Sequence, residues 1–362
     1  LQEEDARRAN RYGFSRHEKA LPLYTRADAL RALSLLVAVP PGRAFRPDGA
    51  LSRHTLTFTP VGHLLGACAV TLQEPGRGGR RLVFSGDVGR QHDLLMPAPQ
   101  APDAADVLLV ESTYGNRDHP DVKPLDDLER VTKEAIQRGG MMLVASFAVG
   151  RAQQLVYLLR TLIAAGRIPE IPVWIDSPMA VDATEVFRKH VAEHDFSEAV
   201  TEGVMPSLVS PFLRMAKTAN ESKAINAHDG PGVIIASSGM MNGGRILHHL
   251  AQRLPDPATT VLVAGFQAAG TRGRTLIDGA RTLRIHGRDV PVRATVRRVD
   301  ALSGHADRRE IVRWLTGLPA PKRTFLVHGE PPAARGMGEV LREKFGWDVT
   351  VPAIGDTVEL DS

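Results

Sequence analysis

Three short stretches of the sequence each place an imidazole or a carboxylate beside glycine, close to an apolar run. They are "PVGHLLGA" with His63, "FSGDVGR" with Asp87 and "LVHGE" with His328. Two imidazoles and a carboxylate are suitable ligands for zinc or a similar ion. The flanking glycines let a backbone approach an ion or a phosphate closely. The alternative for each side chain is a loop polar group that caps a neighbouring backbone, and the three stretches alone leave both interpretations open.

Two further polar side chains lie in settings that favour a role in chemistry. His305 occurs in "ALSGHADRRE", a loop of small residues before an expected helix, and Asp307 is expected to cap that helix. The cap is compatible with an incidental His305 and with a catalytic one. Glu111 ends the apolar run "VLLVE", which is a poor setting for a casual surface charge. A carboxylate there could accept a hydrogen bond from an imidazole and fix its tautomer.

Three loops that follow apolar runs combine glycines, hydroxyls and an arginine, groups that bind anions through backbone amides and charge. These loops are "SFAVGRAQQ", "ASSGMMNGGR" and "AGFQAAGTRGR". Their candidate phosphate-binding residues are Ser146, Arg151, Ser237, Ser238, Gly239, Thr271 and Arg274, with Arg245 as an alternative cation. The stretch "GFQAAG" lacks the glycine spacing of a dinucleotide-binding fingerprint. Three such loops on successive strands predict a ligand with several phosphates.

The segments that must position these residues alternate between short apolar runs and helix-like stretches. Apolar runs such as "RLVF", "VLLV" and "TFLV" are expected to be buried strands. Residues 151–165 carry apolar side chains at helical spacing. This alternation predicts an α/β fold, in which ligands collect at the carboxyl ends of strands. The candidate residues, His328 included, lie at such ends.

Length and composition limit the class of protein. The chain has 362 residues, which fits two domains, and its single cysteine excludes internal disulfides and cysteine-based zinc sites. Low cysteine use also favours a reducing cytoplasm. No apolar run approaches the length of about 20 residues that a membrane span needs, and no secretory signal is visible. The formal net charge of +4 suits a polyanionic partner but is weak evidence alone.

Taken together, the motifs resemble those of a known family. The stretches "TPVGHLLGA", "FSGDVGR", "ESTYGNR", "SFAVGR", "SSGM", "GFQAAGTRGR", "SGHAD" and "LVHGE" occur in the order seen in metallo-β-lactamase-fold nucleases of the β-CASP group. The likeness is strongest to the bacterial and archaeal relatives of the endonuclease subunit of the eukaryotic mRNA 3′-end cleavage complex. It implies a metallo-β-lactamase fold, an αββα sandwich, with an inserted α/β β-CASP domain. The lactamase-type segments would be residues 1–117 and 296–362, and the insertion residues 118–295.

The resemblance also implies roles for individual residues. His63 matches a ligand of one zinc, Asp87 a ligand that bridges two zincs, and His328 a ligand of the second. Glu111 matches motif A, His305 motif B and His328 motif C. In the family the motif B histidine is thought to contact the scissile phosphate and assist the leaving group, which makes His305, with Asp87 and Glu111, the expected catalytic set. A histidine at motif C resembles the RNA-processing branch of the family.

The sequence departs from the family in one respect, because it lacks the family's His-x-His-x-Asp-His motif. No two of the thirteen histidines are spaced i, i+2, and "EEDARRANRYGFSRHEKALPLYT" resembles the segment that follows the motif. Because the chain also begins with Leu1 inside a charged, helix-like stretch, we expect a lactamase fold that is incomplete at its N-terminus. Two zinc ions are expected in the intact protein, and less than one tightly bound zinc in this chain.

The resulting prediction is that the intact protein is a cytoplasmic, zinc-dependent ribonuclease that hydrolyses RNA phosphodiester bonds in RNA processing or decay, and the activity of this chain stays open. RNA is the expected partner, a membrane is not, and a homodimer stays open. One alternative is a non-catalytic RNA-binding remnant that lacks the metals. Another is a lactamase-fold hydrolase of small esters or thioesters, against which the large phosphate-binding region argues. The sequence does not identify the RNA or distinguish endonucleolytic from exonucleolytic cleavage.

Overall fold

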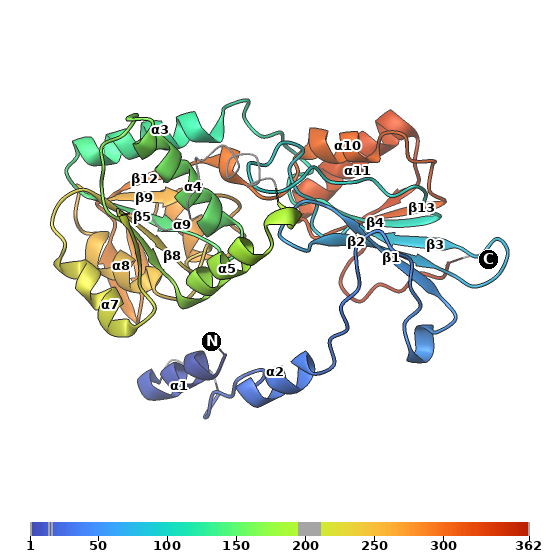
Figure 1. Cartoon of the computed structure of the whole chain (residues 1–362), viewed down its shortest axis with the longest axis horizontal. Coiled ribbons are helices and arrows are strands. Elements are labelled where there is room, and N and C mark those ends of the chain that lie inside the picture. Colours follow the sequence, from blue (N-terminus) through green and yellow to red (C-terminus); the bar gives the residue numbers. More distant parts are fainter. Residues whose placement is uncertain (1, 14, 16, 195–210, 361–362) are drawn as a thin grey trace.

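The structure, a computed structural model, describes residues 2–13, 15, 17–194 and 211–360. Two six-stranded sheets form its framework, and helices pack around them (Figure 1). The first sheet has the strand order β1-β2-β3-β4-β13-β14. Its strands are β1 (Thr55–Pro60), β2 (Cys68–Gln73), β3 (Arg81–Phe84), β4 (Val107–Glu111), β13 (Arg323–Val327) and β14 (Val349–Thr350).

Strand directions in the first sheet bring several carboxyl ends to one edge. β2 runs antiparallel to both β1 and β3, while β3, β4 and β13 are parallel neighbours. The strands β1, β3, β4 and β13 therefore all end at the same edge. Helices α10 (Arg308–Leu315) and α11 (Pro331–Phe345) lie on one face of this sheet (Figure 1). Their Trp314 and Met337 share a buried core with Leu108, Val110 and Leu326 of the strands.

The opposite face of the first sheet carries two rows of apolar side chains. One row is formed by Leu56, Leu72 and Leu82, and the other by Phe58, Val70, Phe84, Leu109 and Phe325. These residues share a face because successive side chains of a strand point to opposite sides of the sheet. Leu72 and Leu82 are half-buried and Phe84 is exposed. This face is therefore much less covered than the face under α10 and α11.

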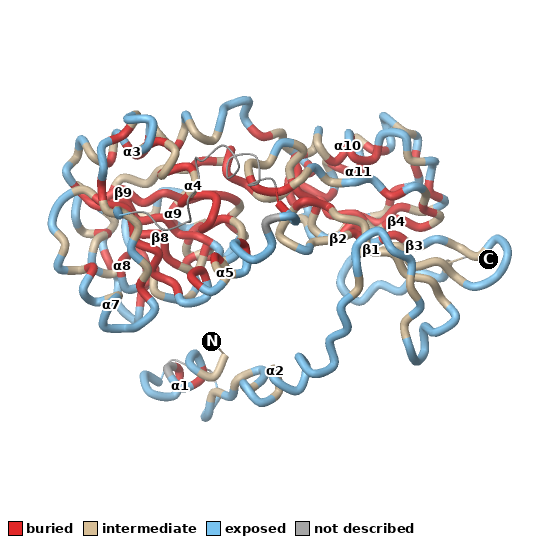
Figure 2. Tube along the Cα trace, viewed as in Figure 1, coloured by how far each residue is buried: buried red, intermediate tan, exposed pale blue. Residues whose placement is uncertain are grey.

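The second sheet is parallel throughout and has the order β12-β9-β5-β8-β6-β7. Its strands are β5 (Met141–Ala145), β6 (Val173–Asp176), β7 (Leu213–Met215), β8 (Gly232–Ala236), β9 (Thr260–Val263) and β12 (Thr295–Arg298). The central strands are buried on both faces, which explains their continuous apolar runs. Figure 2 shows this buried centre.

Helices cover both faces of the second sheet. One face packs against α3 (Pro124–Gln137), α4 (Arg151–Ala164) and α5 (Pro178–Lys189). The other packs against α8 (Ile246–Arg253), α9 (Arg272–Ile277) and the hairpin of β10 (Thr282–Ile285) and β11 (Arg288–Pro291). The short helix α7 (Ala219–Ala224) follows β7. Single 3-10 turns occur at η1 (Gly49–Leu51), η2 (Val191–Glu193), η3 (Ile225–Ala227) and η4 (Asp300–Leu302).

The N-terminal segment lies apart from both sheets (Figures 1 and 2). It contains α1 (Gln2–Tyr12) and α2 (Arg26–Leu33), and α2 has no buried residue. Large apolar side chains in this segment are exposed, among them Leu23 and Val37. None of the helices in the described part of the chain is long and apolar enough to cross a membrane.

The alternation of strands and helices is the α/β arrangement that the sequence predicts, and α4 begins at Arg151 as expected. Strands of the first sheet come from residues 55–111 and 323–350, and those of the second from residues 141–298. β12 crosses the expected division at residues 295 and 296 and pairs with β9 of the second sheet. The division of the chain into domains at 118 and 295 stays a prediction.

Candidate active site

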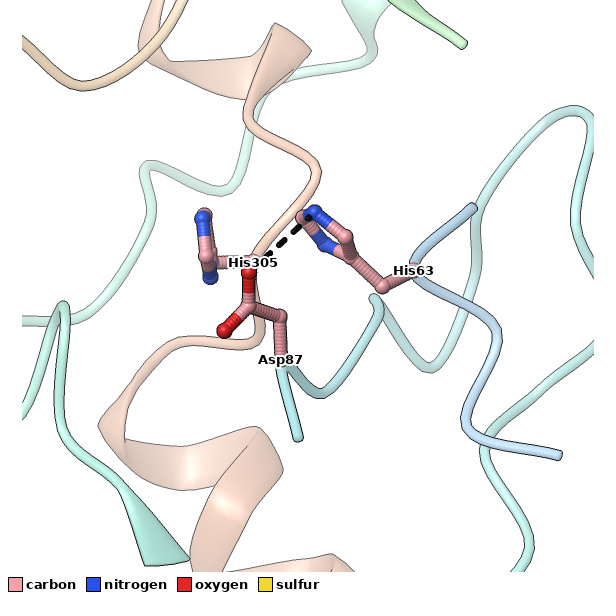
Figure 3. Close-up of side chains that lie close together, drawn as sticks. All are labelled: His63, Asp87 and His305. Atoms are coloured by element: carbon pink, nitrogen blue, oxygen red, sulfur yellow. Dashed lines mark ion pairs between the residues drawn. The ribbon is translucent and has the colours of Figure 1, made fainter. Parts of the chain in front are cut away.

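Four of the candidate residues lie at or just after the ends of strands that reach the same edge of the first sheet. His63 comes shortly after β1 and Asp87 shortly after β3, while Glu111 is the last residue of β4 and His328 directly follows β13. His305 reaches the same place from the loop between η4 and α10. Figure 3 shows that His63, Asp87 and His305 point toward one another.

Asp87 lies between two imidazoles. Its Oδ2 atom is 3.8 Å from Nε2 of His63, and its Oδ1 atom is 3.2 Å from Nδ1 of His328. A carboxylate that presents one oxygen to each imidazole is suited to bridge two ions. Ligand atoms of His63, Asp87 and His305 all lie within 4.8 Å of one another, and those of Glu111, His305 and His328 form a second such group. The nitrogen and oxygen donors present therefore fit a zinc-type metal.

The orientation of His63 prepares it for ligation. Its Nδ1 atom is 3.0 Å from the carbonyl oxygen of Gly304, and because a carbonyl only accepts, the ring must donate from Nδ1. Nε2 then keeps its lone pair on the side of Asp87. Burial, and next the nearby His305, lower the pKa of His63. Both effects favour the neutral imidazole that binds a metal.

Glu111 and His305 form a buried ion pair. Glu111 is 1% exposed, and its Oε1 atom accepts from the backbone N–H of Val88 at 2.7 Å and from Nδ1 of His305 at 3.0 Å. Burial alone would raise the pKa of Glu111, but His305 and the hydrogen bonds outweigh it and lower that pKa. Burial alone would lower the pKa of His305, but the charge of Glu111 and its hydrogen bond raise it. The pair therefore favours the charged form of His305 and leaves its Nε2 atom outside the contact with Glu111.

Thr113 connects this pair to His328 and was not singled out by the sequence. Its hydroxyl donates to Oε2 of Glu111 at 2.6 Å and lies 3.3 Å from Nδ1 of His328. The signal was present in "ESTYG", because residues i and i+2 of an extended chain point to the same side. Thr113 therefore fixes the positions of two candidate groups at once.

His328 combines an exposed side chain with a left-handed backbone. Its side chain is 56% exposed, and its φ angle is 54°. The turn at His328 ends β13 abruptly and directs the imidazole back toward Asp87. The next residue, Gly329, packs against Ser112. A Cβ added to Gly329 would lie only 2.4 Å from the Ser112 hydroxyl oxygen. The glycine beside His328 is thus required by the packing of two strand ends.

A cavity of about 560 Å3 lies between the facing edges of the two sheets. It is lined by His63, Asp87, His305 and His328, and by Arg151, the first residue of α4. Burial lowers the pKa of Arg151 to about 10, and Asp93 opposes this shift. Arg151 therefore remains a cation at neutral pH and places a positive charge in the cavity.

The remaining phosphate-binding candidates follow β5, β8 and β9, which are adjacent in the second sheet. The hydroxyl of Ser146 donates to the carbonyl of Phe147, and that of Ser237 donates to Ser177. The Ser238 hydroxyl accepts from the backbone of Asn242 within its own turn. These hydroxyls are thus engaged locally, and phosphate binding by them stays a prediction.

The candidates after β9, with Gly239 and Arg245, are placed differently. Thr271 caps α9 by accepting from the backbone N–H of Arg274, and Arg274 pairs with Asp278 on the surface. Arg274 also lines a neighbouring cavity of about 310 Å3. Gly239 lies against the ring of Phe147, and the alternative cation Arg245 pairs with buried Asp176 at 2.6 Å. Phosphate binding by Gly239, Thr271 and Arg274 stays a prediction. Arg245 instead forms an ion pair with Asp176, the last residue of β6.

Comparisons with known proteins bear on this site. Residues 152–276 match the Beta-Casp domain, and residues 289–352 match the Zn-dependent metallo-hydrolase RNA specificity domain. The chain is 37% identical over 315 residues to Ribonuclease TTHA0252 of Thermus thermophilus, covering 86% of this chain and 70% of that protein. The chain belongs to the β-CASP group of metallo-β-lactamase-fold RNA nucleases.

Two further relatives carry different names. The RNase J-like protein of Methanocaldococcus jannaschii is 31% identical over 279 residues, which cover 75% of this chain and 63% of that protein. Transcription termination factor FttA of Pyrococcus horikoshii is 31% identical over 355 residues, which cover 94% of this chain and 53% of that protein. Family membership confirms the predicted fold, a metallo-β-lactamase fold with a β-CASP insertion, and makes the chain a hydrolase of the ribonuclease class by family.

Proposed function

We propose that the protein is a zinc-dependent ribonuclease that hydrolyses RNA phosphodiester bonds. The observation that carries this proposal is the convergence of three metal-type donors and a Glu111-paired imidazole on one cavity. His63, Asp87 and His328 would hold the metal. A bound zinc would supply Lewis acidity toward the phosphate and toward the attacking water.

The protein's own groups divide the remaining work. Arg151 offers a desolvated positive charge to the phosphate within the cavity. Glu111 holds Nδ1 of His305 at 3.0 Å, so the proton on Nε2 is the one that can pass to the leaving oxygen of the RNA. Thr113 holds Glu111 and keeps the pair in register with His328. Because His305 lies within reach of the same donors, its role as the acid rather than as a ligand is part of the proposal.

The experiment is single-turnover cleavage of end-labelled RNA by the purified chain, with zinc, with other divalent ions and with EDTA. We expect cleavage that needs a metal and disappears in Asp87→Asn, whose amide cannot act as a bridging anion. Glu339→Gln is the matched control, since Glu339 lies on α11 and lines a separate surface pocket. The product lengths distinguish endonucleolytic from exonucleolytic cleavage.

Cleavage that persists in Asp87→Asn would contradict the proposed site. RNA binding without any metal-dependent cleavage would favour the non-catalytic RNA-binding alternative. The chain spans 53% to 70% of the lengths of the three relatives named above. Cytoplasmic location is part of the proposal, whereas a homodimer has no support from the described residues and is left out of it.

A further inference from the structure

The cavity between the two sheets has an apolar part that the phosphodiester chemistry leaves unused. Its polar part contains the candidate ligands and Arg151. Its apolar part, which we call the apolar lobe, is lined by Leu64, Leu95, Met96, Phe147, Met179 and Phe187. A cavity with one charged part and one apolar part is built for a ligand with the same division.

The floor and the rim of the apolar lobe differ in exposure. On the floor, Leu95 and Phe187 are each 1% exposed and pack together as a separate small core with Met96. On the rim, Phe147 is 48% exposed and Met179 is 46% exposed. Single exposed apolar side chains are ordinary, but two on the rim of one cavity with an apolar floor mark a binding surface.

Phe147 is held in place although it is exposed. It is the second residue after β5, and its carbonyl accepts a hydrogen bond from the hydroxyl of the preceding Ser146 at 2.9 Å. A Cβ added to Gly239 would lie 2.8 Å from the Phe147 ring, so the ring rests directly on the backbone after β8. A ring that is already fixed loses little conformational freedom when a ligand packs on it.

The apolar lobe adjoins the candidate metal ligands. Leu64 directly follows His63, and its side chain lies close to Gly150, beside Arg151. Arg151 itself begins the helix that follows the Phe147 loop. A ligand whose anionic group lies near Arg151 would therefore place its next chemical group at the lobe. In RNA that neighbouring group is a sugar that carries a flat nucleobase.

Polar side chains of the same cavity that adjoin the apolar lobe bond to one another. Gln154 donates from Nε2 to Oδ2 of Asp93 at 3.4 Å, and Arg151 donates to the Gln154 oxygen. Because these groups are already partnered, the lobe is suited to the face of a base rather than to its edge. Binding through the face is tolerant of sequence, since every base has one.

We propose that the apolar lobe holds the nucleobase next to the scissile phosphate and that Phe147 is the platform on which this base stacks. This inference rests on the proposed ribonuclease function. Phe147 is thus a substrate-positioning residue that demands a base at one position without selecting which base. It sets the register of the RNA relative to His305 and the metal ligands.

The test measures binding of a short labelled RNA to the full chain in EDTA, so that affinity is read without cleavage. The RNAs are an intact sequence and a series with a single abasic nucleotide at each position. The variants are Phe147→Ala, the conservative Phe147→Trp, and Val186→Ala as a control that is similarly exposed, at 47%, on α5. Thermal melting checks that each variant folds.

We expect Phe147→Ala to weaken binding of intact RNA by about 5- to 150-fold, the usual range for one stacked base. An abasic nucleotide at one position should weaken binding to the wild type similarly but have little further effect in Phe147→Ala. Phe147→Trp should restore both affinity and discrimination, and Val186→Ala should match the wild type. Changing that base among the four should alter affinity far less than removing it.

Two outcomes overturn the inference. One is an abasic effect that is equally large in Phe147→Ala and the wild type, and the other is an abasic effect shared equally by all positions. Failure of the ribonuclease proposal looks different, because it shows as absence of metal-dependent cleavage by the wild type whatever residue stands at 147. A wild type that binds no RNA would overturn both.

Discussion

Replacement of Glu111 by glutamine tests whether the negative charge of this buried side chain, and not only its packing, stabilises the site. The glutamine oxygen can take the place of Oε1 and keep the bonds from Val88 and His305. The amide nitrogen then stands where Oε2 accepted from Thr113, whose hydroxyl can turn to accept instead. The variant therefore keeps the size and position of the side chain. It loses the negative charge that faces His305 and the long hydrogen bond, 3.3 Å, that Oε2 of Glu111 accepts from the backbone N–H of Thr113.

The magnitude follows from these losses. A hydrogen bond to a charged group contributes about 1.5–3 kcal/mol and a neutral one about 0.5–1.5 kcal/mol. Glu111→Gln should therefore lower the free energy of unfolding by about 2 kcal/mol. Glu134→Gln is the matched control, because Glu134 pairs with Arg130 and Arg297 at the surface. Surface pairs contribute about 0–1 kcal/mol, so the control should change little.

The effect of Glu111→Gln should also depend on pH. The raised pKa of His305 gives stability that is fully present below the unfolded value of about 6.5 and is lost as pH rises through the folded pKa. The lowered pKa of Glu111 gives stability that is present above its unfolded value of about 4.3 and is lost as pH falls through the folded pKa. The loss caused by the variant should therefore be largest between about pH 4.5 and 6.5.

The assay is urea unfolding of the wild type, Glu111→Gln and Glu134→Gln in EDTA, at a series of pH values from 4 to 9. The reasoning fails if Glu111→Gln costs no more than the control. It also fails if the cost is the same at pH 5.5 and pH 9. An NMR titration of His305 gives an independent check, because its pKa should fall in Glu111→Gln.

Three further predictions concern the metal, the acid and the second sheet. In the intact enzyme, His328→Ala should lose metal and cleavage together, whereas His305→Ala should keep metal and RNA affinity but lose about 10²- to 10⁴-fold in turnover; equal metal loss in both variants would refute this division. Elemental analysis should find less than one tightly bound zinc in the purified chain, and two zincs would contradict the expectation. Asp176→Asn should cost about 3 kcal/mol near pH 7, because buried Asp176 pairs with Arg245 and His249 at 2.6 Å. These partners lower the pKa of Asp176 against the effect of burial. The stability that Asp176 contributes is therefore lost as pH falls through its folded pKa. In urea unfolding between pH 3 and 7, the difference in free energy of unfolding between the wild type and Asp176→Asn should shrink as pH falls.

The sequence indicates that the strand-end residues lie close together, and the reason is physical. Asp87, Glu111 and His328 each end an apolar run, and parallel strands bring their carboxyl ends to one edge of a sheet. Local pattern and topology therefore suffice to place them together. His305 was identified from its small-residue loop. The sequence also predicted that Glu111 accepts a hydrogen bond from an imidazole, and in the structure Nδ1 of His305 lies 3.0 Å from Oε1 of Glu111.

Other features depend on contacts that no local pattern contains. The apolar lobe is assembled from Leu95 in a loop, Phe147 after β5 and Phe187 on α5, which are far apart in the sequence. The Ser238 hydroxyl accepts a hydrogen bond within its own turn, as short polar side chains often do; this contact could not be predicted from the sequence, and phosphate binding by Ser238 stays a prediction. Arg245 likewise finds a buried carboxylate on another strand, and only the tertiary structure reveals that partner.

The left-handed backbone at His328 has a consequence for how the protein can lose its activity. A residue with a Cβ pays roughly 1–2 kcal/mol for that conformation, and glycine, which avoids this strain, adds roughly 0.5–1 kcal/mol of disorder to the unfolded chain. The imidazole, at 56% exposure, contributes little burial. Substitution of His328 by glycine or asparagine should therefore change the free energy of unfolding very little, and such variants should not be removed as unfolded chains. If His328 holds the metal as proposed, such variants would fold normally and yet lack cleavage, so the defect would show only in activity.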